Sequence, residues 1–283
     1  MNLQYYKLKN DFIKKIKGDE DIFNKAMFII HTVRRVELMG MKEKFLKDIS
    51  CYIRFMDSFV VASGVPYFNY VFAKFSKMNI KEHETVILNN DDVKSCFEFA
   101  RDIDGADIEA LGKRVRDLGN AEYSYLFTTL DLKHFKEYED VILKSCDPKY
   151  NCYFASLNGA DFDRHEKAVI DSNDPYYNYL FALIFPNSDV LMHEDVVIRS
   201  GDLEYNYLFV KNIKGADIFR HGEIIYSSGN EDMIKKYNEL LRKMIMVYAD
   251  KIADTIINGD NDTFSFDLLD NITSGYKRRV FRK

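Results

Sequence analysis

The sequence predicts an all-α fold, a right-handed α-solenoid of six helix-turn-helix repeats with helical caps at both ends. Three observations predict it. A motif centred on an aromatic residue returns every 27 or 28 positions, and helix start and stop signals divide each period into two short helices. The composition, 47% hydrophobic over 283 residues, suits a chain that buries a continuous core.

The N-terminal segment, residues 1–62, shows helical periodicity without the repeat motif, for example at Phe12, Ile13 and Ile16. A further helical stretch covers about 41–61. We expect this segment to form a helical cap on the repeats, because an open stack needs a terminal element that prevents end-to-end association.

The repeats occupy residues 63–229, and they are clearest at 150–170, 177–198 and 205–225. Three more copies align when a central phenylalanine is used as the anchor. The six anchors are Phe72, Phe99, Phe127, Phe154, Phe181 and Phe209. We call the helix that contains the anchor helix A and the helix that follows it helix B.

Residues that commonly cap or terminate helices occur at the expected ends of each helix. Helix A follows Asp92, Asp147, Asp174 or Asp202, whose carboxylates can accept the free backbone N–H groups of a first turn, or follows Asn120. Gly-Ala-Asp then recurs at 105–107, 159–161 and 215–217, where glycine can adopt a positive φ and aspartate can cap helix B. Each helix is expected to run for about nine or ten residues.

After the repeats, residues 230–258 predict one longer capping helix with an apolar stripe. The stripe comprises Ile234, Tyr237, Leu240, Leu241, Met244 and Tyr248. Residues 259–283 form a tail of weak periodicity that ends in the basic run YKRRVFRK.

Two rows of helix A are the candidate partner-binding surface. Counting from the anchor, positions −4, −1 and 0 share the predicted core face, whereas −2 points away and −3 lies on the flank. The predicted contact residues at these two positions are Tyr70, Tyr125, Tyr179, Tyr207, Asn69, Asn151, Asn178 and Asn206. Tyrosine and asparagine suit a protein or peptide ligand. Alternatively, the same face packs on helix A of the next repeat, and the asparagine forms hydrogen bonds between neighbouring repeats.

Four histidines share one position of helix B: His83, His165, His193 and His221. Equivalent residues of stacked helix pairs lie about 10 Å apart, which is too far to share one metal ion. Leu111 and Tyr138 replace histidine in the other two units, so we expect an apolar seam with histidines that hydrogen-bond across it, and no metal or cofactor.

Catalytic motifs are absent from the sequence: it contains no H-E-x-x-H, G-x-S-x-G, phosphate loop or G-x-G-x-x-G. The four cysteines lack C-x-x-C spacing, so we expect them to be reduced and mostly packed. No apolar run is long enough to span a membrane, and the first residues lack a secretory signal. The sequence therefore predicts a cytoplasmic protein that is not an enzyme.

The distribution of charge along the sequence indicates which class of partner the chain can bind. Residues 61–229 hold 18 Lys and Arg against 28 Asp and Glu, a net charge of −10. An acidic repeat block disfavours nucleic acid, whose binding depends on neutralising phosphates. The basic residues lie at the ends, at Lys14, Lys15 and Lys17 and in 276–283. Nucleic-acid binding through these ends is the alternative prediction.

The repeats resemble short helix-turn-helix solenoids related to the TPR and HEAT classes. The phrase Y-x-Y-x-F-A-x(4)-G-A-D-I-x(3)-E-x-x-V-I is similar to arrays in uncharacterised bacterial and phage proteins. The resemblance covers residues 63–229 but departs from TPR and HEAT in period, so it assigns no binding residues. It implies a binding scaffold for a protein partner. A phage or mobile-element inhibitor that occludes a host protein is a further alternative.

Overall fold

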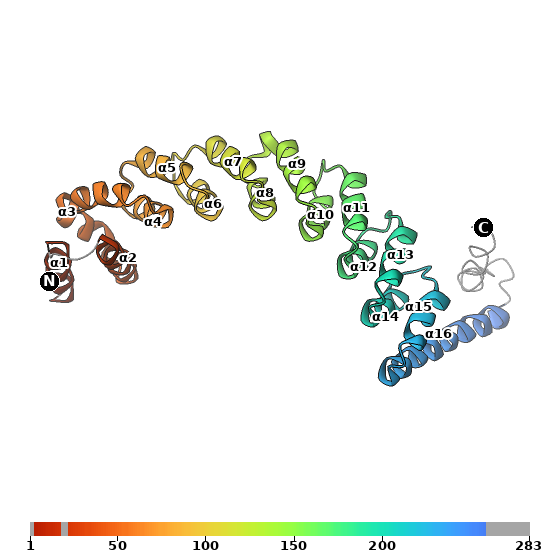
Figure 1. Ribbon diagram of the computed structural model, residues 1–283. Coiled ribbons are helices and arrows are strands. Elements are labelled where there is room, and N and C mark those ends of the chain that lie inside the picture. The colour runs from red at the N-terminus through yellow and green to blue at the C-terminus, as the bar shows by residue number, and fades with distance from the viewer. Residues whose placement is uncertain (1–2, 18–21, 259–283) are drawn as a thin grey trace. The chain divides into compact units, whose positions relative to one another are not determined.

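The structure, a computed structural model, describes residues 3–17 and 22–258. These residues form helices and no strand, which confirms the all-α prediction. Contacts divide the described residues into two compact units, with the division between Ser145 and Cys146. In both units consecutive helices pack as neighbouring pairs, as Figure 1 shows. This arrangement agrees with an α-solenoid, whereas the handedness and the number of repeats stay predictions.

The first unit begins with three helices that pack against one another, α1 (Leu3–Lys17), α2 (Ile22–Leu38) and α3 (Lys42–Ala62). The helices that follow are α4 (Pro66–Ser76), α5 (Ile80–Leu88), α6 (Val93–Asp102), α7 (Ile108–Asp117), α8 (Ala121–Phe127), the short 3-10 helix η1 (Leu132–His134) and α9 (Phe135–Ser145). Within the unit α4 pairs with α5, α6 with α7 and α8 with α9, and α6 also packs on α4 and α8.

The second unit comprises α10 (Pro148–Ala155), α11 (Phe162–Asp171), α12 (Pro175–Ile184), α13 (Val190–Ser200), α14 (Leu203–Asn212), α15 (Ile218–Ser227) and α16 (Glu231–Asn258). The pairs are α10 with α11, α12 with α13 and α14 with α15. Helices α10, α12 and α14, which contain the anchors, also contact their neighbours in that order.

The predicted helix caps are confirmed. Asp174 and Asp202 accept hydrogen bonds from the backbone N–H groups of Tyr177 and Tyr205, each at 3.0 Å, and Asp107, Asp161 and Asp217 cap the second helices of their pairs. The glycines of the three Gly-Ala-Asp turns have φ between 83° and 88°, a region in which a side chain would be strained. Local sequence therefore fixes where these helices begin and end.

The anchor phenylalanines form the centre of the packing, because all six are at most 2% exposed. The terminal helix α16 packs on α14 and α15 through its predicted stripe, with Tyr237 buried and Ile234, Leu240, Leu241 and Met244 partly buried around it. The side chain of Tyr248 and the whole tail 259–283 lie outside the described residues. Beyond Met244 the side chains of Ile245, Met246 and Val247 are exposed.

The four cysteines divide into two buried and two exposed residues. Cys96 and Cys152 are buried, and burial raises the pKa of their thiols to about 12 and about 11. These two are packing residues, as expected. Cys51 and Cys146 are exposed, so the expectation of packing is wrong for them. Cys51 lies on the exposed face of α3, near its middle, and Cys146 follows the last residue of α9.

Candidate partner-binding surface

The asparagines of the predicted surface are buried. Asn69, Asn151, Asn178 and Asn206 all have 0% exposure. The Nδ2 amide of Asn178 donates to the backbone carbonyls of Val169 at 2.9 Å and Asp174 at 2.8 Å. Asn206 makes the same pair of bonds to Val197 and Asp202, at 3.0 and 2.7 Å. Burial removes these side chains from any ligand, because helix A packs on both flanks and the asparagine occupies a junction between helices.

The histidines complete this junction. The Oδ1 atoms of the four asparagines lie 2.7–2.8 Å from the Nδ1 atoms of His83, His165, His193 and His221. All four histidines have 0% exposure, and each ring lies 5.0–5.7 Å from the ring of its anchor phenylalanine. The predicted hydrogen bonding across an apolar seam is confirmed. Asn178 and Asn206 thus each join their own helix A to the helices B on either side.

The glutamate after the histidine extends the network. Glu84, Glu166 and Glu194 accept hydrogen bonds from the backbone N–H groups of Asp107, Asp189 and Asp217, each at 2.5 Å. These aspartates are the N-caps of the following helix B. Glu166 and Glu194 also lie 3.4 Å from Nε2 of His193 and His221, but these two Nε2 atoms form no hydrogen bond. The His-Glu dipeptide therefore joins successive helices B.

Asparagine and histidine occur together within the chain. Asn69, Asn151, Asn178 and Asn206 pair with His83, His165, His193 and His221, and where Leu111 and Tyr138 replace histidine, Cys96 and Ser124 replace asparagine. No repeat has the asparagine without the histidine, or the histidine without the asparagine. This joint loss indicates that the pair acts as one unit, and it is a signal in the sequence that could have placed asparagine in the interior.

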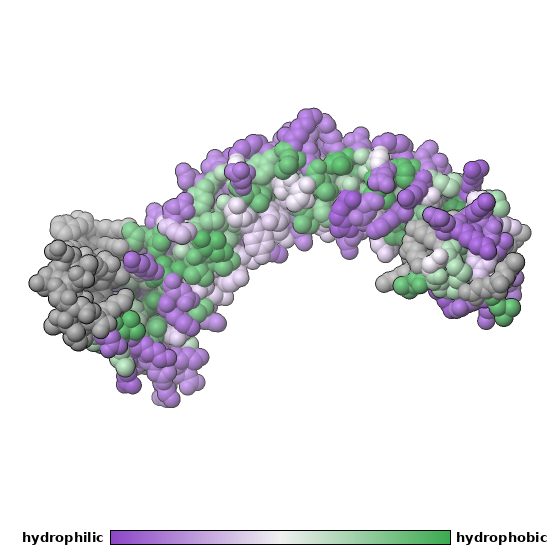
Figure 2. All heavy atoms as spheres, turned by 180° about the vertical axis from the view of Figure 1, so that it is seen from behind, coloured by the Kyte–Doolittle hydropathy of each residue, from purple (hydrophilic) through white to green (hydrophobic). Residues whose placement is uncertain are grey.

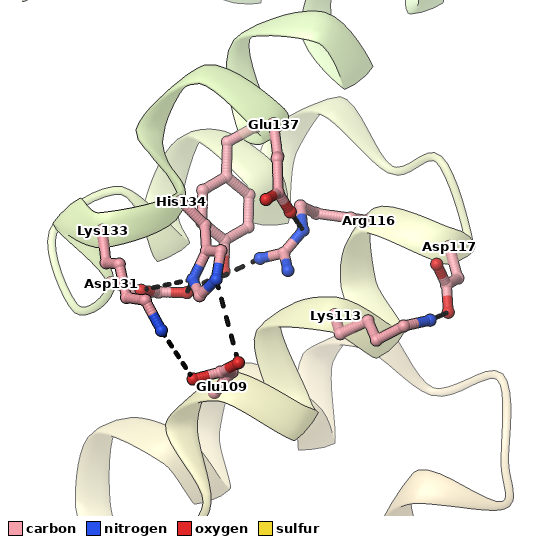
Figure 3. A network of polar contacts seen from close by, with 9 residues as sticks. Glu109, Lys113, Arg116, Asp117, Asp131, Lys133, His134 and Glu137 are labelled. Carbon is pink, nitrogen blue, oxygen red and sulfur yellow. Dashed lines mark hydrogen bonds and ion pairs between the residues drawn. The ribbon is translucent and has the colours of Figure 1, made fainter.

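A charged cluster lies in the first unit where Tyr138 replaces histidine. Figure 3 shows Arg116 of α7 directed towards Asp131 and towards Glu137 of α9, with ion-pair distances of 3.5 and 3.0 Å. Asp131 also lies 2.8 Å from Nδ1 of His134 and accepts a hydrogen bond from the Tyr138 hydroxyl at 3.0 Å.

The charges of this cluster compensate one another. The Arg116 guanidinium lies 4.6 Å from the centre of the Tyr138 ring, and Tyr138 is fully buried, which raises its pKa. Opposite charges and hydrogen bonds at these distances offset part of the cost of burying these groups. The cluster therefore replaces the missing Asn–His pair as a polar junction between helices.

The predicted tyrosine row divides between interior and surface. Tyr70 and Tyr179 are only 7% exposed, and their hydroxyls bond to neighbouring helices A, Tyr70 donating to Asp102 at 2.5 Å and Tyr179 accepting from Asn212 at 2.6 Å. Tyr125 and Tyr207 are half-buried. The alternative in which this face packs on the next helix A thus describes Tyr70 and Tyr179.

A different set of tyrosines is exposed together on the second unit. Tyr153 of α10 and Tyr176 of α12 are 40% and 42% exposed, and Tyr177 and Tyr205 are half-buried. The Tyr176 ring lies 4.7 Å from that of Tyr177 and 5.7 Å from that of Tyr205. We call these four residues the tyrosine surface. Tyr153 (position −1) and Tyr177 and Tyr205 (position −4) were predicted on the core face, whereas Tyr176 is at position −5, for which no prediction was made. Of the predicted core positions −4, −1 and 0, only position 0 is fully buried in all six copies.

The tyrosine surface is electrostatically coupled. Burial raises the pKa of Tyr177, and the nearby Tyr153 phenol adds to the increase. Burial likewise raises the pKa of Tyr205, and the carboxylates of Glu204 and Asp202 add to the effect. The phenols of Tyr177 and Tyr205 are therefore neutral at neutral pH, close to carboxylates.

The remaining observations concern metal sites, membrane spans, surface hydropathy and the basic segments. No three His, Cys, Asp or Glu side chains within 3–17 and 22–258 are arranged to hold a metal ion. None of the helices described combines the length and apolar character needed to cross a membrane. On the faces visible in Figure 2, hydrophobic residues (green) form patches separated by hydrophilic ones (purple). The side chains of Lys15 and Lys17 and the basic run 276–283 lie outside what the structure describes.

Comparisons with family models, with curated proteins and with solved structures give no match to this chain.

The Asn–His pair predicts a large energetic coupling. Asn178→Cys and His193→Leu each leave a buried polar group without its partner, which costs about 1–3 kcal/mol. The double variant recreates the combination of Cys96 and Leu111, so its loss of unfolding free energy should be smaller than the sum of the single losses by about 1–3 kcal/mol. Chemical denaturation of the four proteins measures this difference, and strict additivity would contradict the pairing.

The buried histidines predict acid sensitivity. Desolvation lowers the pKa of His193 from 6.5 to about 4. Between these values the unfolded chain binds more protons than the folded chain, so the free energy of unfolding falls as the pH falls, by on the order of 3 kcal/mol at most. The raised pKa of Glu166 acts in the opposite sense and reduces the loss. Chemical denaturation at several pH values between 7 and 4 should show that the free energy of unfolding falls less steeply for Asn178→Cys/His193→Leu than for the original chain. If it falls equally in both proteins, His193 is not the cause of the acid sensitivity.

The close packing of Gly112 of α7 against Tyr138 can be tested by adding a side chain at position 112. A Cβ there would lie 2.1 Å from the Tyr138 hydroxyl oxygen, whereas one at Gly222 would lie 3.2 Å from the Tyr237 ring. Gly112→Ala should lower the free energy of unfolding by about 1 kcal/mol, because overpacking exceeds the gain in helix propensity. Gly222→Ala is the matched control with a smaller loss. Tyr138→Phe removes the clashing atom and should relieve the loss caused by Gly112→Ala; equal losses in both backgrounds would contradict the account.

Proposed function

We propose that this chain is a non-enzymatic scaffold that binds a protein partner through the tyrosine surface. The observation that carries the proposal is the convergence of Tyr153, Tyr176, Tyr177 and Tyr205 on three successive helices A, α10, α12 and α14, with two of the four about 40% exposed. Tyrosine offers a large amphipathic contact area at low entropic cost and is enriched among the residues that dominate binding energy.

The rigidity of the support favours recognition. Helices α12 and α14, which present Tyr176 and Tyr205, are joined to the helices B beneath them by Asn178 and Asn206. A surface whose supporting helices are held by buried hydrogen bonds loses little conformational entropy when a partner binds. Tyr207, from the row predicted first, remains half-buried on the same unit.

The proposal includes a cytoplasmic location, which the buried thiols of Cys96 and Cys152 support because reduced cysteines are usual there. An inhibitor that occludes a host protein would use the same surface and differs only in the identity of the partner. Nucleic-acid binding through the basic ends is the competing function, and its steep salt dependence distinguishes it.

The expected result is a loss of partner binding on removal of the exposed rings. The variant Tyr153→Ala/Tyr176→Ala should weaken the affinity for the partner isolated with the original chain by roughly 30-fold or more, because two central tyrosines contribute more than about 1 kcal/mol each. Calorimetric or surface-based titration with the purified partner measures the effect.

The matched control is Tyr67→Ala/Tyr226→Ala, since both of these tyrosines are 46% exposed and lie outside the tyrosine surface. Both variants should keep the helical circular-dichroism signal. Equal affinities for the two variants would refute the proposed surface.

A further inference from the structure

Carboxylates surround the tyrosine surface. Asp174 and Asp202 are the N-caps of α12 and α14, and the exposed Glu204 lies in the first turn of α14. All three interact electrostatically with the Tyr205 phenol. Asp147, the N-cap of α10, interacts in the same way with Tyr177. The Lys149 ammonium also acts on the Tyr177 phenol, with the opposite sign. A ligand in contact with the rings would therefore lie near four carboxylates and one ammonium group, a net negative environment.

The aromatic rings of helix A already bind cations within the chain. The Lys149 ammonium lies 4.8 Å from the centre of the Tyr150 ring, beside the tyrosine surface, and 3.2 Å from its hydroxyl. Lys211 lies 5.9 Å from the centre of the Tyr207 ring. A cation over the face of a tyrosine is attracted by the ring quadrupole, most strongly where carboxylates are close. The geometry is thus suited to a further cation supplied by a ligand.

We propose that the tyrosine surface binds an arginine-containing, basic segment of a protein partner; this inference rests on the proposed function. A guanidinium group is planar, so it stacks on an exposed tyrosine ring while its edge donates hydrogen bonds to a carboxylate such as Glu204. Lysine offers the charge without the planar stacking. Nucleic-acid bases also stack on tyrosine, but their phosphates would face these carboxylates and a repeat block with a net charge of −10, from 18 basic and 28 acidic residues in 61–229.

The test titrates the full chain with fluorescent 12-residue peptides in which arginine, lysine or glutamate alternates with glycine, and with a 12-nucleotide oligothymidine. The arginine peptide should bind several-fold more tightly than the lysine peptide, and the glutamate peptide and oligothymidine should not bind. Raising the salt concentration from 50 to 300 mM should weaken binding of the arginine peptide about tenfold, because screening reduces the charge attraction.

Variants localise the binding. Tyr176→Ala and Glu204→Gln should each weaken binding of the arginine peptide, Glu204→Gln by about two- to fivefold, as expected for one exposed charge. The charge-matched control is Asp163→Asn in α11, an exposed carboxylate on another helix, which should leave the affinity unchanged. Equal losses for Glu204→Gln and Asp163→Asn would indicate unlocalised attraction to an acidic chain and would overturn the inference.

The two proposals fail in different ways. If Tyr153→Ala/Tyr176→Ala abolishes binding of the natural partner while the arginine peptide binds equally to every variant, the scaffold stands and the basic ligand is wrong. If oligothymidine binds in preference to the arginine peptide and binding depends on Tyr176, the surface binds nucleic acid and the inference is overturned. If the natural partner binds both tyrosine variants equally, the tyrosine surface itself is wrong.

Discussion

A hydrogen bond between an asparagine of helix A and a histidine of helix B is the interaction on which the stacking depends. The asparagine Nδ2 group faces backbone carbonyls, which can only accept, so its Oδ1 atom must face the histidine. The histidine must then donate from Nδ1. Each donor and acceptor of the amide is fixed by its neighbours, and a shift of one helix would leave several buried polar groups unsatisfied.

The surface follows from this interior. Because the asparagines lie at the junction of three helices, they are unavailable to a ligand, and the adjacent Tyr70 and Tyr179 fill the space between successive helices A. On the second unit the beginnings of α12 and α14 are among the parts that stay exposed or half-buried, and there the capping aspartates and the tyrosines occur together. The same turn that starts each helix thus places aromatic rings and carboxylates side by side, and these groups define the ligand chemistry that we propose.

Features encoded by neighbouring residues were predictable from the sequence. The period, the capping aspartates and the positive-φ glycines each depend on local conformation, and the structure agrees with them. The positions of Asn178 and Tyr179 were not predictable from one helix, since a helical wheel assumes a single buried stripe, whereas a stacked helix is buried on several sides. The information was nevertheless present in the joint replacement of Asn and His by Cys96 and Leu111. The cluster around Asp131 and Arg116 does not recur in the other repeats, so comparing the repeats in the sequence could not reveal it.

The most direct test of this account is the protonation state of the buried imidazoles, measured by nitrogen-15 NMR on protein labelled at histidine. The account predicts that at pH 7 His83, His165, His193 and His221 all carry a proton on Nδ1, as donors to the asparagine Oδ1 atoms. His193, whose pKa burial lowers to about 4, should be neutral with Nε2 unprotonated. Proton placement on Nε2 alone would contradict the account, because the asparagine and histidine would then present two acceptors to each other.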